Sequence, residues 1–104
     1  MDLGRKERLA SLVNYQQGSV VSRTIINKRA GTVTLFAFDR GETLSEHTAP
    51  FDALLHVLEG QALVTVEEKE SVINASEAIL LPAGKPHSVR AIVRFKMLLT
   101  MIRE

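Results

Sequence analysis

The sequence predicts an all-β protein of a single domain, either a two-sheet sandwich or a small barrel. Three observations support this prediction. After residue 15, short apolar runs rich in β-branched residues alternate with turn residues to the end of the chain. The chain has 104 residues, a length that suits one domain. Hydrophobic residues make up 45% of it and charged residues 24%, the balance of a globular protein rather than a disordered one.

One segment favours a helix, and it precedes all the strands. Residues 5–13, RKERLASLV, are expected to form about two helical turns. Turn residues such as Asp39-Arg40-Gly41 and Glu59-Gly60 then separate eight apolar runs. Seven to nine short strands with almost no helix are typical of a sandwich or barrel. The predicted strands are residues 20–26, 32–38, 54–58, 62–66, 71–74, 78–81, 88–93 and 95–102.

Several predicted strands are apolar on both faces. In the segment 95–102 only Lys96 and Thr100 are polar, and 54–58 is almost as apolar. A monomeric sandwich of this size leaves one face of its sheets to water. We therefore expect the second face to be covered by another copy of the chain, so that the protein is a homodimer. We expect residues 1–104 to form one domain, in which the segment 1–30 contributes to the dimer and about residues 31–102 form the barrel.

Composition and charge exclude several classes of function. The net charge of +1 is a cancellation, because both ends of the chain are basic whereas residues 31–79 carry nine acidic and two basic groups. These regions can pair within one chain or across a dimer. Basic residues are dispersed and aromatic residues are few, so we expect no nucleic-acid partner. Cysteine is absent, which excludes thiol catalysis and disulfides.

Membrane and export signals are also missing from the sequence. No apolar run approaches the ~20 residues of a membrane span. The N-terminus MDLGRKERLASLV has no signal-peptide core. We therefore expect no membrane partner and a cytoplasmic location.

Two spaced motifs are the most informative part of the sequence. The segment 41–60 reads GETLSEH, TAPFDA and LLHVLEG, and it resembles the first motif of the cupin superfamily, G-x5-H-x-H-x3,4-E-x6-G. The segment 76–91, with LPAGKPH at its centre, resembles the second motif, G-x5-P-x-G-x2-H-x3-N. The resemblance covers about residues 30–102 and implies a double-stranded β-helix, which is a small jelly-roll barrel. The residues that match these motifs are Gly41, His47, Gly60, Pro82, Gly84 and His87.

The resemblance implies four metal ligands, of which this chain keeps two. They would lie at His47, at position 49, at position 53 and at His87, but alanine occupies positions 49 and 53. A methyl group donates nothing to a metal. If a divalent Fe, Mn, Ni or Zn ion is bound, His47 and His87 are its expected protein ligands, with solvent or substrate completing the site.

Two further polar side chains lie near the missing ligands in the sequence. Asp52 and His56 would share the strand face opposite to that of position 53, so they should point away from His47. A bulge after Pro50 could re-aim Asp52. For His56 we expect an outward position at the dimer interface.

Strand alternation also predicts the walls of a cavity beside the two histidines. Two alanines in place of polar ligands leave room and remove charge, so the cavity suits a small, largely apolar ligand held by two imidazoles. The other interpretation is that these side chains simply fill the barrel. The predicted lining residues are Phe36, Phe38, Ala49, Ala53, Leu55, Val57, Val89, Ala91, Met97, Leu99 and Met101.

Three classes of function remain open from the sequence. The first is a non-enzymatic or sensor-like barrel that binds a small molecule between His47 and His87. The second is a small metal-dependent enzyme of dioxygenase, isomerase or decarboxylase type. The third is an oligomerising module whose cavity is filled. The sequence identifies no catalytic residue.

Overall fold

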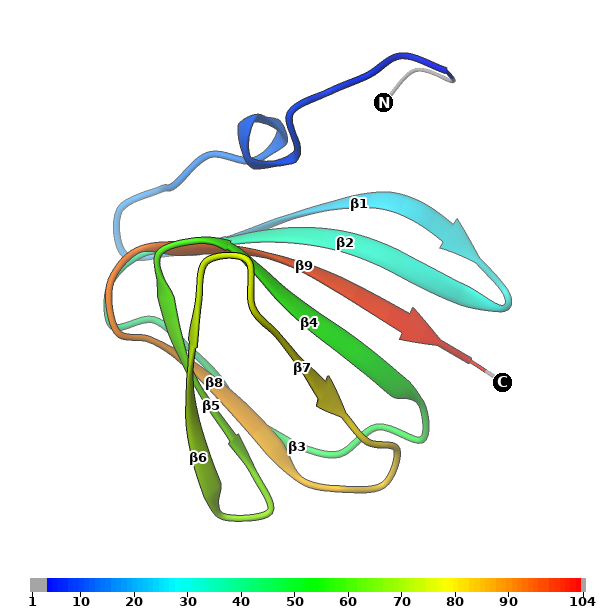
Figure 1. Cartoon of the computed structure of the whole chain (residues 1–104), viewed down its shortest axis with the longest axis vertical. Coiled ribbons are helices and arrows are strands. Elements are labelled where there is room, and N and C mark those ends of the chain that lie inside the picture. The colour runs from blue at the N-terminus through cyan, green and yellow to red at the C-terminus, as the bar shows by residue number, and fades with distance from the viewer. Residues whose placement is uncertain (1–3, 104) are drawn as a thin grey trace.

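A computed structural model describes residues 4–103, so residues 1–3 of the N-terminal segment and residue 104 lie outside the described residues. Within residues 4–103, nine strands form two antiparallel sheets that face each other (Figure 1). A short 3-10 turn, η1 (Leu9–Leu12), precedes them. The strands are β1 (Val20–Lys28), β2 (Gly31–Phe38), β3 (Thr43–His47), β4 (Asp52–Glu59), β5 (Gln61–Val66), β6 (Lys69–Asn74), β7 (Ala78–Leu81), β8 (His87–Ala91) and β9 (Phe95–Ile102).

The chain crosses repeatedly between the two sheets. The five-stranded sheet has the order β1-β2-β9-β4-β7, and the four-stranded sheet has the order β3-β8-β5-β6. Consecutive strands such as β2 and β3, or β8 and β9, therefore lie in different sheets, which is the jelly-roll arrangement expected for this sequence. The edge strands β6 and β7 are joined by a short turn, coloured yellow in Figure 1, and they diverge away from it.

All eight predicted strands are present, with their ends moved by at most two residues. The run predicted at 88–93 ends earlier, at Ala91, because Ile92 and Val93 lie in an exposed bend before β9. The sequence did not predict β3 as a strand. Four of its five residues are exposed, so this edge strand has no alternation of apolar and polar residues to reveal it.

The two-turn helix expected at residues 5–13 is reduced to the single turn η1. No side chain caps its N-terminus, and it has no acidic residue in its first turn. The Ala10 carbonyl accepts a hydrogen bond from the Lys96 amine on β9 instead of a helical N–H. Tertiary contacts therefore replace the helix that local propensity favours. No helix in the described residues has the length and apolar character needed to cross a bilayer.

The main core lies between the two sheets and is built by strict strand alternation. On β4, Ala53, Leu55 and Val57 point inward and are buried, while their neighbours are more exposed. His87, Val89 and Ala91 alternate in the same way on β8. Phe38 and Phe95 stack at the centre, with ring centroids 4.5 Å apart. This core holds the inner face of each strand in a fixed orientation.

A second, smaller core covers part of the outer face of the five-stranded sheet. Val13 from the N-terminal segment packs there against Leu35 and Ala37 of β2, with Leu9 and Leu12 beside them. The Tyr15 hydroxyl donates a hydrogen bond to Glu59 Oε2 at 2.7 Å. The N-terminal segment of residues 9–15 is thus attached to its own barrel.

Candidate functional site

Four cross-strand partners form one row near an end of the four-stranded sheet. His47 of β3 pairs with His87 of β8, His87 pairs with Val66 of β5, and Val66 pairs with Lys69 of β6. Directly opposed residues in a sheet share the same face. Val66 packs against the core between the sheets, so the whole row faces inward. We call these four residues the inner row.

His47 joins the inner row because β3 contains an irregularity. Leu44 pairs with Val89, and the next pair is His47 with His87, so three steps on β3 match two steps on β8. In a regular strand Glu46 would oppose His87. The extra residue turns His47 inward and leaves Glu46 exposed, which is the effect of a β-bulge.

The two imidazoles face each other through their Nε2 atoms, which are 3.1 Å apart. His47 Nδ1 lies 2.7 Å from the Ser45 carbonyl oxygen, and His87 Nδ1 lies 3.2 Å from the Lys85 carbonyl oxygen. A carbonyl oxygen only accepts hydrogen bonds, so each Nδ1 must carry a proton to make these contacts. In two neutral rings both Nε2 atoms are then lone-pair acceptors. The pair can share one proton, accept a donor group from a ligand, or contact a cation.

The two histidines differ in their exposure to solvent. His87 is 7% exposed, whereas His47 lies on the edge strand β3 and is exposed. Burial lowers the pKa of His87 below its ordinary value; the Lys85 carbonyl opposes this shift and the neighbouring His47 adds to it. The buried ring is therefore kept neutral more readily than a free histidine, and it retains its capacity to accept a hydrogen bond.

The donor set does not fit a metal held by three or four protein ligands. Within residues 4–103, no group of three or more histidine, aspartate or glutamate side chains is arranged to hold a metal ion. Ala49 and Ala53 present methyl groups where the motif has ligands. Asp52 is exposed, and its Oδ1 accepts a hydrogen bond from the Ala83 N–H at 2.8 Å. His47 and His87 are the two donors that remain.

The third histidine lies on the opposite side of the five-stranded sheet. His56 is half-buried on β4, and its cross-strand neighbours are Leu98 and Ala78. The side chains of Ala53, Leu55 and Val57 point inward and are buried, so the His56 side chain points to the other face of the sheet, as expected from strand alternation. His56 is therefore separated from the histidine pair by the sheet itself.

The side chains predicted to line a cavity are packed in the core. Phe38, Leu55, Val57 and Met97 are completely buried. Ala53, Val89 and Ala91 are buried with them, while Phe36, Leu99 and Met101 are half-buried against the same cluster. Ala49 lies in the loop before β4, where its carbonyl accepts a hydrogen bond from the Gly84 N–H at 2.8 Å. All of these side chains except that of Ala49 belong to the main core or pack against it.

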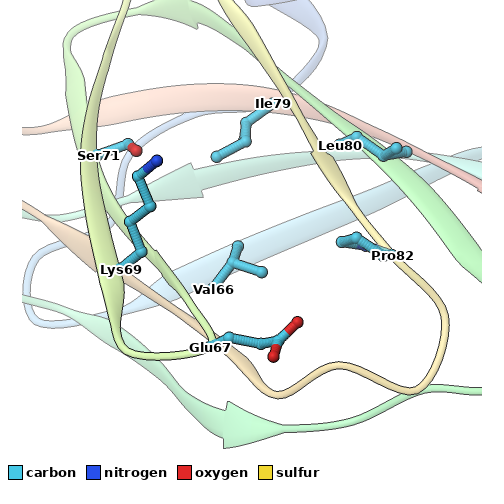
Figure 2. Close-up of a pocket in the computed structure, with 7 residues that line it drawn as sticks. All are labelled: Val66, Glu67, Lys69, Ser71, Ile79, Leu80 and Pro82. Carbon is cyan, nitrogen blue, oxygen red and sulfur yellow. The ribbon is translucent and has the colours of Figure 1, made fainter.

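A cavity of about 400 Å³ lies at the open side of the barrel between the edge strands β6 and β7 (Figure 2). Its apolar wall is formed by Val66, Ile79, Leu80 and Pro82. Its polar wall is formed by Glu67, Lys69 and Ser71. A cavity of this volume is large enough for a small molecule. Two of its lining residues, Val66 and Lys69, belong to the inner row that also contains the histidine pair.

Sequence reasoning did not find this polar wall. Glu67, Lys69 and Ser71 surround a charged hairpin, and residues 67–70 lie between the predicted strands 62–66 and 71–74. The structure begins β6 at Lys69, which shares one face of the strand with Ser71 and the buried Ile73. A period-two pattern of Lys69, Ser71 and Ile73 was the available signal, but two of its three members are polar.

Comparisons with known proteins agree with this architecture. The family model described as "Cupin domain" matches residues 34–102. The uncharacterized Bacillus subtilis protein YdbB is 29% identical over 93 residues, which cover 88% of this chain and 81% of that protein. A conserved Streptococcus pyogenes protein of unknown function superimposes with a TM-score of 0.95 at 28% identity, covering 100% of this chain and 91% of the other. A cupin superfamily protein from Desulfitobacterium hafniense superimposes with a TM-score of 0.94 at 28% identity, covering 100% of this chain and 95% of the other.

Proposed function

The chain belongs to the cupin domain family, and we propose that it is a binding barrel for a small, largely apolar molecule. The ligand is held by one hydrogen-bond donor group, which the Nε2 atoms of His47 and His87 accept. One observation carries this proposal: the two Nε2 atoms converge at 3.1 Å while both Nδ1 atoms face backbone carbonyls. An acceptor pair built in this way is matched by a hydroxyl or similar group.

The surroundings of the pair support a mainly apolar ligand. Next to His87 in the inner row is Val66, which packs against the core and also lines the cavity. Alanine at positions 49 and 53 places methyl groups where a metal-binding barrel has polar ligands. Apolar walls with a few convergent polar groups are the usual composition of a small-molecule site.

Thermal denaturation in the presence of small phenols and alkanols tests this function. A compound that binds should raise the melting temperature of the wild-type protein. The substitutions His47→Ala and His87→Ala should each abolish that increase, whereas His56→Ala, on the outer face, should retain it. A compound that stabilises all four proteins equally would argue against the histidine pair as the anchor.

A metal-dependent cupin enzyme of dioxygenase, isomerase or decarboxylase type is the second candidate. The convergence of two imidazole nitrogens favours it, but solvent or substrate must complete the coordination of a divalent ion. Metal analysis after purification without chelators, and again after addition of Fe, Mn, Ni or Zn, distinguishes the two functions. Near-stoichiometric metal that depends on both histidines supports the enzyme, and metal content near zero in both preparations eliminates it.

We further propose that the protein is a homodimer that associates through the outer face of the five-stranded sheet. Cross-strand pairs there align one residue from each strand into a nearly apolar row. Three of its members are large, apolar and about half exposed. Thr100 on the central strand β9 is its polar member. The row consists of Ile26, Val33, Thr100, Leu54 and Leu80.

The row is complementary to itself. A two-fold axis along β9 would place Ile26 against the partner's Leu80 and Val33 against the partner's Leu54, as an isologous interface requires. Ile26 lies in the N-terminal segment 1–30, which is how that segment would contribute to the dimer. Neither nucleic acid nor a membrane is a proposed partner, and the proposed location is the cytoplasm.

A further inference from the structure

The polar wall of the cavity between β6 and β7 carries one cationic side chain, Lys69. Figure 2 shows the Lys69 amine beside the Ser71 hydroxyl, with Ile79 on the other side of the space. Among the described residues 4–103, neither the Lys69 amine nor the Ser71 hydroxyl has a hydrogen-bond or ion-pair partner. The third polar residue, Glu67, is 3.7 Å from the Lys85 amine, which offsets its negative charge. Lys69 and Ser71 thus supply uncommitted donors to the cavity.

The remaining walls of this cavity are apolar. Val66 and Ile79 pack against the barrel core, and Pro82 begins the loop that leads to His87. A ligand in this cavity therefore meets positive charge and a hydroxyl at the β6 edge and hydrocarbon toward the interior. A carboxylate attached to an apolar body matches both surfaces, because a carboxylate only accepts hydrogen bonds.

The register of the four-stranded sheet connects this wall to the histidine pair. Lys69, Val66 and His87 are successive members of the inner row on β6, β5 and β8. Neighbouring strands are about 4.8 Å apart, so the backbones of Lys69 and His87 are separated by roughly 10 Å. Val66 occupies the interval between them. A molecule about the length of one substituted benzene ring can lie across Val66 and reach both polar ends.

We propose that the ligand of the barrel is a small hydroxylated carboxylic acid with its two polar groups at opposite ends. Lys69 and Ser71 bind the carboxylate, Val66 and Ile79 contact the apolar body, and the histidine pair accepts the hydroxyl. The role of the hydroxyl rests on the proposed function; the role of the carboxylate depends only on the cavity between β6 and β7.

Three probes separate the two ends of this site: 4-hydroxyphenylacetate carries both groups, phenylacetate lacks the hydroxyl, and 4-methylphenol lacks the carboxylate. Binding is measured by calorimetry at low ionic strength, because an exposed charge contact is screened by salt. The wild-type protein should bind 4-hydroxyphenylacetate more tightly than either partial probe. Lys69→Gln should weaken the binding of both acids about tenfold and leave the affinity for 4-methylphenol unchanged. Arg90→Gln, which removes a charge from the outer face of the same sheet, is the matched control and should change none of the three affinities.

His47→Ala should give the reciprocal result, with weaker binding of 4-hydroxyphenylacetate and 4-methylphenol and unchanged binding of phenylacetate. Equal affinity of the acids for wild-type and Lys69→Gln proteins would overturn the carboxylate assignment, even if the phenol still required His47. Phenol binding that is indifferent to His47 would instead refute the proposed function. Failure of 4-hydroxyphenylacetate to bind the wild-type protein more tightly than both partial probes would overturn the two-ended ligand.

Discussion

The Nε2 atoms of His47 and His87 lie 3.1 Å apart, although the two residues are 40 positions apart in the chain. Their contact depends on backbone geometry at both ends. The irregularity in β3 brings His47 inward, and Pro86 precedes His87 at the start of β8. Each ring is then oriented by a carbonyl two residues earlier in the chain. Local backbone groups thus fix the direction in which the two acceptors face.

Gly60, between β4 and β5, should tolerate no side chain. Its φ is +81°, and a Cβ there would lie 2.0 Å from the Arg94 carbonyl oxygen and 2.7 Å from Phe95 Cβ. Gly60→Ala is therefore expected to reduce the free energy of unfolding by more than about 3 kcal/mol. Gly84→Ala is the matched control, because Gly84 has φ +76° but open space around it. It should cost about 1–2 kcal/mol, the conformational cost alone. Equal costs in urea denaturation would contradict the steric explanation.

Asp39 should make the protein sensitive to acid. The Gly18 N–H, the Arg94 guanidinium and the Arg40 N–H lower the pKa of Asp39 to about 2. Because the pKa is lower in the folded state, ionised Asp39 stabilises the fold above about pH 4, and this stabilisation is lost as the pH falls toward 2. Asp39→Asn should flatten the dependence of unfolding free energy on pH in that window. Glu46→Gln, at an exposed position on β3, should keep the wild-type slope. If the unfolding free energy of the Asp39→Asn protein depends on pH as steeply as that of the wild type, Asp39 is not the source of the acid sensitivity.

Tyr15 should stabilise the attachment of the N-terminal segment in two separable ways. Burial and the neighbouring Glu59 carboxylate raise the pKa of its hydroxyl, which donates a hydrogen bond to Glu59. The Arg94 and Lys96 side chains lie over its ring at 5.2 and 4.9 Å from the centroid. Tyr15→Phe should cost about 1 kcal/mol of stability, and Tyr15→Ala should cost more because the ring contacts are also lost. Chemical denaturation followed by circular dichroism measures both, and equal losses would show that the ring contributes nothing.

The nearly apolar row on the outer face of the five-stranded sheet, from Ile26 to Leu80, should control association of two copies of the chain. Leu54→Glu or Ile26→Glu places a charge inside this row or at its end, and burying an unpaired charge opposes association. Light scattering should give the mass of a dimer for the wild-type protein and of a monomer for either variant. Val72→Glu is the control, since Val72 is 50% exposed on β6 of the other sheet. It should remain dimeric. A monomeric wild-type protein at micromolar concentration would remove the proposed interface.

Most of the fold was predictable because burial follows strand alternation closely. The inward positions of Ala53, Leu55 and Val57 agree with the parity expected from the sequence, and this also excludes Asp52 from the site. The strand β3 was not predictable, since an exposed edge strand needs no apolar side chains. The extra residue between Leu44 and His47 likewise has no sequence signal, because bulges are determined by pairing with the neighbouring strand.

The polar wall of the cavity escaped prediction for a related reason. An inward position on a central strand must be apolar, but Lys69 occupies the open edge of the barrel, where its amine reaches solvent. Composition alone therefore cannot distinguish its strand from a charged turn. Ser71 is polar at the next inward position for the same reason. Only the register with Val66 and His87 reveals that Lys69 belongs to the same inner row as the histidine pair.

Long-range proton–nitrogen NMR of the histidine side chains tests the acceptor pair itself. The spectrum at neutral pH should show Nδ1 protonated in both His47 and His87, with at most one proton shared between the two Nε2 atoms. Addition of 4-methylphenol should shift both Nε2 resonances and leave those of His56 unchanged. A protonated Nε2 beside an unprotonated Nδ1 in either ring, or binding of the phenol without a shift at this pair, would contradict the proposed anchor.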